Sequence, residues 1–178
     1  MIPRSSAQLR RGPFLCRNSC EQAIRALLLA QEGSTTRLLQ TLCRNDISVQ
    51  VIDQQVVDKL PIALDGELPG TRFLRRLSSL HAGGHVLLDS FSYTALDVLP
   101  TLVASELIEG TRPIGHVFSH LWTRRTFRGG DADLLESLWA EVGDPDPPSS
   151  RTLCIHTPRA PCMLLAETFR GGVLAQLY

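Results

Sequence analysis

The chain has 178 residues, 43% hydrophobic and 20% charged, which is an ordinary globular composition with enough length for one domain and its core. Eighteen basic residues balance eighteen acidic ones, so the net charge is zero. This balance argues against a sequence-independent grip on nucleic acid, which relies on excess positive charge. No apolar run is long enough to span a membrane, and the first residues contain no apolar secretory core.

The first half of the sequence predicts an irregular N-terminal segment, followed by two helices, a strand and a β-hairpin. Residues 1–15 are expected to be irregular, with a single domain over residues 16–178. Capping residues and helical spacing of apolar residues predict a helix from Asn18 or Ser19 to about Glu32 and a second, short helix after Ser34 and Thr35. Alternation of apolar and polar residues predicts strands at 47–53, 72–80 and 85–93, with a hairpin turn at 81–84.

The second half predicts the remaining elements in the order helix, strand, helix, strand, strand. Their expected ranges are a helix at 97–109 with Pro100 in its first turn, a short segment at 116–120, a strand within 122–127, a helix capped by Asp131 or Asp133, and strands at 152–156 and 162–169. The total is about six strands and four or five helices, with the strands in hairpins. This order predicts an α+β fold with a single antiparallel sheet flanked by helices.

A carboxylate lies on the apolar face of the last predicted strand. Side chains alternate between the faces of a strand, so Glu167 points the same way as Met163, Leu165 and Phe169. An ionised carboxylate among such neighbours is costly unless it is paired or hydrogen-bonded. The position indicates a small polar site inside an apolar pocket. A structural ion pair, or a register in which that face is solvated, is the alternative.

Two arginines occupy comparable positions on the strand predicted at 72–80. Arg75 shares a face with Phe73 and Leu77, whereas Arg76 points to the opposite face. A guanidinium can hold a carboxylate with two parallel hydrogen bonds. An inward arginine on one strand and an inward glutamate on another therefore predict a site for a small anionic molecule.

Metal and nucleophile motifs are absent from the sequence. The five cysteines, an odd number, favour reduced thiols in a cytoplasmic protein over a disulfide framework. His116 and His120 are one helical turn apart, but no acidic or thiol ligand lies near them in sequence. The sequence therefore predicts neither a metal site nor a bound cofactor.

Five short segments occur in an order found in a known family. They are residues 32–39 (EGSTTRLL), 49–51 followed by Gln55, 73–76 (FLRR), 112–115 (RPIG) and 161–169 (PCMLLAETF). Over about residues 20–178, this pattern resembles the chorismate pyruvate-lyase family. The spacing from Pro161 to Glu167 is closer to a divergent branch of that family than to its ubiquinone-pathway members.

The resemblance implies a six-stranded antiparallel sheet with helices and a site closed beneath helix–turn flaps. It also implies removal of pyruvate from chorismate to give 4-hydroxybenzoate, without a cofactor because the product ring is aromatic. By the same resemblance, Arg75 would bind the ring carboxylate, and the backbone N–H of Ile114 would add a donor. Glu167 would bind the hydroxyl end of the ring and take part in proton transfer.

The sequence departs from the ubiquinone-pathway lyases on the strand after the hairpin. Those enzymes carry a second substrate-binding arginine there, whereas this chain has Asp89 and Ser90. An aspartate would repel a dianionic substrate unless another arginine compensates. The candidates for that role are Arg37, Arg76, Arg124 and Arg151.

Two other functions remain open at this point. A different enzyme on the same fold, such as a cyclase or pericyclic catalyst with a neutral or monoanionic substrate, would explain the missing arginine. A non-catalytic module that binds a small effector is the second alternative. Fold does not decide between these functions.

Overall fold

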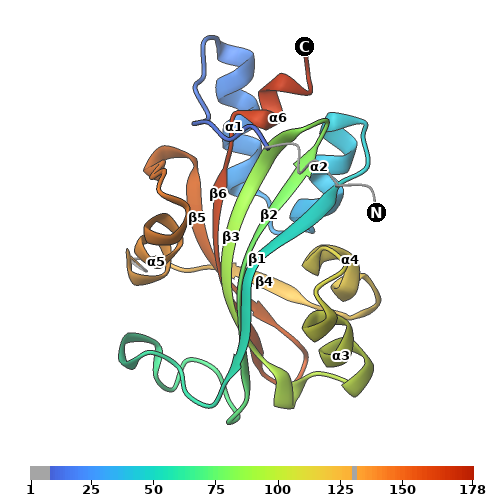
Figure 1. The fold of residues 1–178 in the computed structure, drawn as a ribbon, viewed down its shortest axis with the longest axis vertical. Coiled ribbons are helices and arrows are strands. Elements are labelled where there is room, and N and C mark those ends of the chain that lie inside the picture. The colour runs from blue at the N-terminus through green and yellow to red at the C-terminus, as the bar shows by residue number, and fades with distance from the viewer. Residues whose placement is uncertain (1–8, 130–131) are drawn as a thin grey trace, which may run out of the picture.

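The computed structural model describes residues 9–129 and 132–178 and contains one antiparallel sheet (Figure 1). In these residues the strands follow the order β1-β2-β3-β6-β5-β4. The strands are β1 (Ser48–Val57), β2 (Phe73–Ala82), β3 (His85–Ala95), β4 (Arg124–Phe127), β5 (Ser150–His156) and β6 (Pro161–Phe169). The predicted α+β class with a single six-stranded antiparallel sheet is confirmed.

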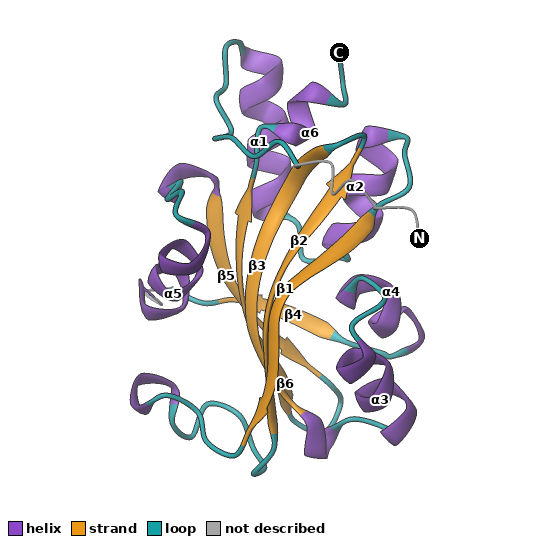
Figure 2. Cartoon of the chain, in the orientation of Figure 1, coloured by secondary structure: helices purple, strands orange, loops and turns teal. Residues whose placement is uncertain are grey.

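Helices cover both faces of the sheet, and Figure 2 shows α5 on one side of it and α3 and α4 on the other. The α-helices are α1 (Ser19–Ala30), α2 (Thr35–Cys43), α3 (Thr101–Glu109), α4 (Ile114–Val117), α5 (Ala132–Val142) and α6 (Gly172–Ala175). Short 3-10 helices occupy Ile62–Leu64, Leu96–Val98, Phe118–His120 and Pro147–Ser149. Among the described residues, no helix has the length and apolar character needed to cross a lipid bilayer.

The alternation of strand side chains divides the core between the two faces. On the α5 face, Leu77 and Phe91 pack with Leu138 of α5. On the opposite face, Leu74 and Leu165 pack with the helices α3 and α4. A third cluster, which includes Leu28 of α1 and Leu39 of α2, covers one end of the sheet. A residue's position on its strand therefore decides which set of helices it contacts.

Most element boundaries agree with the predictions, and the differences follow from local chemistry. Asn18 caps α1 by accepting a hydrogen bond from the backbone N–H of Glu21, as expected. The helix predicted from residue 97 begins only at Thr101, because Pro100 adopts an extended conformation before it. Asp133 lies inside α5 and so is not its N-cap, and Asp131 lies outside the described residues.

The hairpin between β2 and β3 turns at two glycines with positive φ. Gly83 has φ of 55° and Gly84 has φ of 78°, both in the left-handed region that favours glycine. The predicted turn is thus confirmed. It fixes the register in which Ser78 faces Ser90 and Ser79 faces Asp89 on the two strands.

The segment expected to be an irregular lead contacts the sheet over its described part. Arg10 exchanges backbone hydrogen bonds with Gly84 and Val86, at 3.0 and 2.9 Å. Phe14 is buried, and its backbone N–H donates to the Asp146 carboxylate at 2.9 Å. Residues 9–15 are therefore irregular in backbone but packed against the domain.

Candidate functional site

A small cavity lies between the sheet and the two helices α2 and α4. Its volume is about 40 Å³, which is room for a few water molecules. Its wall combines apolar side chains from the sheet with Glu167 and with hydroxyl and guanidinium groups. The lining residues are Thr35, Thr36, Val49, Ser78, Leu80, Leu88, Ser90, Ile114, Gly115, Arg125, Ile155, Leu165 and Glu167.

Glu167 is the buried acid of this cavity, and it is ion-paired. The Glu167 side chain is 4% exposed, and its Oε2 accepts a hydrogen bond from Nε of Arg151 at 2.7 Å and forms an ion pair with Nη2 at 2.7 Å. The pairing follows from the antiparallel register of β5 and β6, in which Arg151 and Glu167 are direct partners. This contact stabilises a carboxylate that the apolar wall alone would disfavour.

Arg151 has no donor left for a ligand. Its Nη1 donates to the carbonyls of Leu28, Leu29 and Gln31 at 2.7, 3.2 and 2.8 Å, and its Nη2 also donates to Thr35 at 3.0 Å. Arg151 thus satisfies the carbonyl end of α1 and the start of α2 while it holds the acid. Its role in this structure is to position Glu167.

Arg76 is a buried cation with unmet hydrogen-bonding capacity. The residue is 1% exposed, and its Nε and Nη1 have no hydrogen-bond partner among the described residues. The one contact found is long, 3.4 Å from Nη2 to the carbonyl of Arg112. Burial lowers the pKa of Arg76 to about 10, so the group remains charged at neutral pH.

Arg76 lies on the same face of the sheet as the cavity, although it is not part of the cavity wall. It is one inward position along β2 from Ser78, which lines the cavity. Its contact to the Arg112 carbonyl places it beside the turn that leads into Ile114. The Ile114 N–H is in the first turn of α4, where no earlier helical carbonyl can accept it.

The structure does not bring Arg75 to Glu167. Arg75 lies on the α5 face, where it forms ion pairs with Asp53 and, at 2.9 Å, with Glu141 of α5. Its guanidinium also stacks over the ring of Phe91 with 5.0 Å between guanidinium carbon and ring centroid. The prediction of one pocket holding Arg75 and Glu167 is therefore not met, because strand alternation puts the two residues on opposite faces of the sheet.

Asp89 and Ser90 separate in the same way. Ser90 lines the cavity, and its hydroxyl lies 3.1 Å from that of Ser78. Asp89 is fully buried on the other face, where it accepts from Arg170 at 2.6 Å and from Arg11 at 3.0 Å. Asp89 does not face the cavity, so it does not repel an anion bound there.

The remaining predicted arginines lie outside the cavity, and one arginine inside it was missed. Arg37 is exposed on α2, and Arg124 is exposed on β4. The next residue, Arg125, lines the cavity instead. Strand alternation across residues 122–127 could have identified it, since Arg124 and Arg125 must point to opposite faces.

The roof of the cavity is a close contact between α2 and α4. A Cβ at Gly115 would lie 2.5 Å from Oγ1 of Thr36 and 2.7 Å from Oγ of Ser34, so only glycine allows this approach. The imidazole Nε2 of His116 lies 3.2 Å from Oε1 of Gln40 on α2. Burial lowers the pKa of His116, and Arg112 and Arg37 lower it further.

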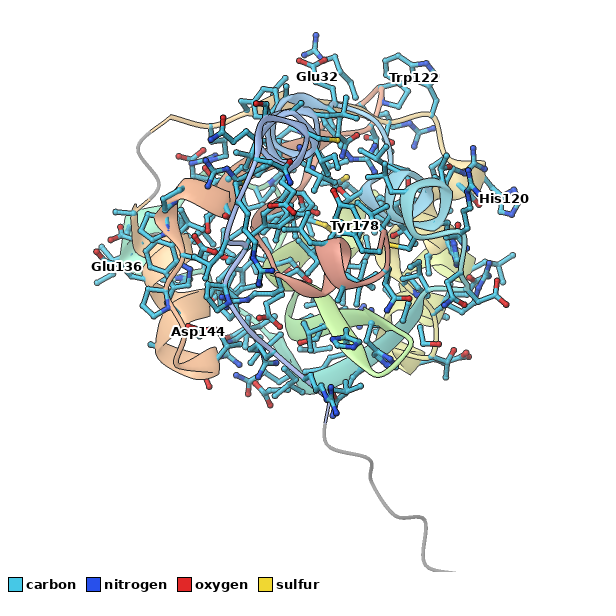
Figure 3. The ribbon with its side chains drawn as sticks, turned by 90° about the horizontal axis from the view of Figure 1, so that it is seen from above. Glu32, His120, Trp122, Glu136, Asp144 and Tyr178 are labelled. Carbon is cyan, nitrogen blue, oxygen red and sulfur yellow. The ribbon has the colours of Figure 1, made fainter. Side chains whose placement is uncertain are left out.

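Larger hollows exist elsewhere but contain fewer converging groups. One of about 700 Å³ lies beside Leu99, Trp122 and Arg159 and is open to solvent. Figure 3 shows Trp122 and His120 at the outer rim of the molecule. In the described residues, no group of three or more His, Cys, Asp or Glu side chains is placed to hold a metal ion. The smaller cavity is the better candidate because the buried carboxylate of Glu167 and the partly buried Arg125 both line it.

This arrangement is an α+β domain in which a buried guanidinium without a full set of partners and a buried carboxylate lie on the same face of the sheet. In chemical terms, a guanidinium donates hydrogen bonds to anions, and a carboxylate accepts a hydrogen bond from a hydroxyl. The apolar part of the wall lowers the local polarity, which strengthens electrostatic interactions inside the cavity.

Comparison with curated proteins finds relatives of one activity. The chain is 30% identical over 96 residues to the chorismate pyruvate-lyase of Mycobacterium leprae, which covers 52% of this chain and 46% of that protein. It is 29% identical over 105 residues to the chorismate pyruvate-lyase of Mycobacterium tuberculosis, covering 54% and 53%. The chain thus spans about half the length of the curated relatives it matches. No family model matches the sequence.

Solved structures with a related overall shape have low sequence identity. The Staphylococcus aureus gene product SA0254 has a TM-score of 0.48 and 10% identity, covering 77% of this chain and 87% of that one. The effector domain of PhnF from Mycobacterium smegmatis has a TM-score of 0.48 and 14% identity, covering 78% and 89%. At these TM-scores the likeness says nothing about function.

Proposed function

We propose that this protein is a cofactor-free lyase that eliminates pyruvate from chorismate to give 4-hydroxybenzoate. The observation that carries the proposal is the buried guanidinium of Arg76, which has two nitrogens without a partner on the face of the sheet that contains Glu167. Leaving a charged donor buried and unpaired costs several kcal/mol, roughly. A ligand carboxylate would recover that cost with two parallel hydrogen bonds.

The proposed reaction suits the groups that surround the cavity. Elimination breaks the ether bond between the ring and the enolpyruvyl group, and a proton leaves the ring carbon that carries the hydroxyl. The departing enolpyruvate takes up a proton and becomes pyruvate. Arg76 binds the ring carboxylate, and the Ile114 N–H adds a donor. Glu167, held in place by its ion pair with Arg151, accepts from the hydroxyl at the far end of the ring and receives the departing proton. Aromatisation of the ring supplies the driving force.

Binding requires the roof of the cavity to move. A substituted six-membered ring does not fit in about 40 Å³. The contact of Gly115 with Thr36 and Ser34 is the place where α4 and α2 must separate. We therefore assign α2 and α4 the role of a lid that opens for substrate and closes over it.

The test is turnover of chorismate by the purified protein without added metal or cofactor, followed by chromatography. Equal amounts of 4-hydroxybenzoate and pyruvate, formed well above the spontaneous rate, are the expected result. Binding of 4-hydroxybenzoate without turnover would instead support a non-catalytic ligand-binding module. Neither binding nor turnover would overturn the proposal and favour a different substrate.

A pair of neighbouring variants tests the anion-binding group. Arg76→Met is expected to abolish binding of 4-hydroxybenzoate while the melting temperature stays equal or rises, because methionine removes an unsatisfied buried charge. Arg75→Met is the matched control, since it loses partly exposed ion pairs on the other face. It should cost about 1 kcal/mol of stability and leave binding intact. The reverse pattern would return the role to Arg75.

A further inference from the structure

We propose that Arg125 is a second anion-binding group in the same cavity, so that the site selects ligands with two carboxylates. The inference rests on the proposed function and deepens it. It assigns the side-chain carboxylate of the substrate to a residue on β4, in place of the strand that carries Asp89 and Ser90.

The position of Arg125 follows from the pairing of β4 with β5. Arg125 pairs with Ile155, and both residues line the cavity. The following residue, Thr126, points to the other face, where its hydroxyl lies 3.0 Å from Nε2 of His156. Among the described residues, Arg125 is the one arginine in the cavity wall.

The guanidinium of Arg125 is uncommitted. In the described part of the chain it has no side-chain hydrogen bond and no ion pair, in contrast to Arg75 and Arg151, whose guanidinium groups are held by carboxylates. The group is only partly exposed. Burial lowers the pKa of Arg125, while the charge of Glu167 opposes that shift. An arginine remains protonated at neutral pH under such conditions.

The charges around the cavity leave a positive excess that matches a dianion. Arg151 neutralises Glu167 through their ion pair. Among the described residues, Arg76 and Arg125 then remain as two cations without an ion-pair partner. Asp89, which would have reduced this excess, is on the opposite face and bound to Arg170 and Arg11.

The two cations come from different parts of the sheet. Arg76 is on β2 and Arg125 is on β4, with β3, β6 and β5 between their strands. A ligand that satisfies both must present its two carboxylates in different directions. A ring with one carboxylate attached directly and another on an ether side chain has this form, and chorismate is such a molecule.

The experiment measures binding, so it does not depend on turnover. Two probes form a matched pair: 4-hydroxybenzoate and 3-(carboxymethoxy)-4-hydroxybenzoate, which adds a second carboxylate through an ether and cannot eliminate pyruvate. Calorimetry should show that the wild-type protein binds the dicarboxylate more tightly. Arg125→Met should lower the affinity for the dicarboxylate by about ten- to a hundredfold, which removes that preference. The affinity for 4-hydroxybenzoate should stay unchanged within error.

Three variants serve as controls. Arg124→Met on the same strand should bind both probes like the wild type, because Arg124 faces away from the cavity. Arg125→Lys should restore part of the preference, since it keeps the charge but not the planar fork. Arg76→Met should weaken both probes.

Each remaining outcome decides the proposal. The role of Arg125 would be overturned if Arg125→Met lowered the affinity for both probes equally. It would also be overturned if the wild-type protein bound both probes equally well. A preference that depends on Arg125 in a protein without chorismate turnover would keep this inference and reject the lyase. Failure of the wild type to bind either probe would reject both.

Discussion

Two consecutive arginines on β2 have opposite environments, because neighbouring side chains on a strand point to opposite faces of the sheet. Arg75 is held by Asp53 and Glu141, whereas Arg76 is buried with two nitrogens unpaired. Both are flanked by apolar residues in sequence. What distinguishes them is the set of helices that covers each face of the sheet. Arg75 lies on the face covered by α5, and Arg76 lies on the face covered by α3 and α4.

At the same scale, Glu167→Gln is expected to reduce both turnover and stability. The amide cannot accept a proton, and Arg151 is left as a buried cation without a counter-charge. Turnover should fall by about a hundredfold or more, as for loss of an acid–base group. The free energy of unfolding should fall by about 2–4 kcal/mol, measured by urea denaturation.

Glu141→Gln is the control for that variant. It removes a carboxylate that is about half exposed and pairs with Arg75 on the far face. The stability change should be under about 1 kcal/mol, with full turnover. Wild-type turnover in folded Glu167→Gln protein would remove Glu167 from the mechanism.

The site was partly predictable from residues alone. Alternation correctly placed Glu167 inward, and it placed Arg75 and Arg76 on opposite faces. It could not show which face holds the cavity, because that depends on which helices pack there. The Arg151 partner was equally hidden, since it depends on the register between β5 and β6.

At the scale of elements, the contact between α2 and α4 closes the roof of the cavity, and the proposed function requires it to open. Gly115 permits the approach, and the His116–Gln40 hydrogen bond joins the two helices. Both lie on short segments at the edge of the fold. Opening the cavity therefore breaks few contacts, which suits a lid.

The folded state should lose stability in acid through the titration of His116. The pKa of His116 is lowered in the folded protein by burial and by Arg112 and Arg37, so the unfolded state binds more protons below pH 6.5. Stability is therefore retained above that pH and lost as pH falls through the folded pKa. His116→Gln should flatten the fall in melting temperature between about pH 8 and pH 5.

The matched control is His120→Gln at the exposed rim, which should keep the wild-type pH profile (Figure 3). His81 and His156, whose pKa values are also lowered by burial, titrate in all three proteins. The contribution of His116 is therefore measured by the difference between the pH profiles of the wild type and His116→Gln, and not by the slope of either profile alone. Identical profiles for wild type and His116→Gln would show that His116 does not contribute to the acid response.

Elements with strong local signals were predicted well. Capping at Asn18 and Ser34 placed the starts of α1 and α2, and the Gly83-Gly84 turn placed the central hairpin. The helix near Pro100 was predicted too long, because apolar spacing continued through a proline that interrupts the backbone. Short 3-10 segments carry too little periodicity to be found.

At the scale of the whole molecule, Asp89 joins distant parts of the chain. Its carboxylate binds Arg11 near the beginning, Ser79 on β2 and Arg170 after β6. Arg170 in turn donates to the carbonyl of Asp144 at 2.6 Å. The network therefore ties the N-terminal segment and the loop after α5 to the centre of the sheet.

Asp89→Asn should destabilise the whole fold without altering the site. It leaves the fully buried Arg170 without its main counter-charge, so unfolding should become easier by about 3–5 kcal/mol in chemical denaturation. Affinity for 4-hydroxybenzoate should be unchanged under native conditions, because Asp89 faces away from the cavity.

The comparison for Asp89 is Glu106→Gln, which breaks the exposed pair with Arg112. Its cost should be under about 1 kcal/mol. A selective loss of binding in Asp89→Asn, with stability retained, would show that Asp89 belongs to the site after all. Neither network nor cost could be predicted from sequence, since its members are far apart in the chain.

The shared guanidinium of Arg151 constrains how this protein can change over generations. The same group holds Glu167 and the carbonyls that end α1. A substitution of Glu167 alone leaves the buried Arg151 without its counter-charge. A substitution of Arg151 alone leaves the buried Glu167 without its counter-charge and removes the hydrogen bonds to the carbonyls at the end of α1. Descendants with a different chemistry at this spot would therefore need paired replacements, so the two positions should vary together or not at all.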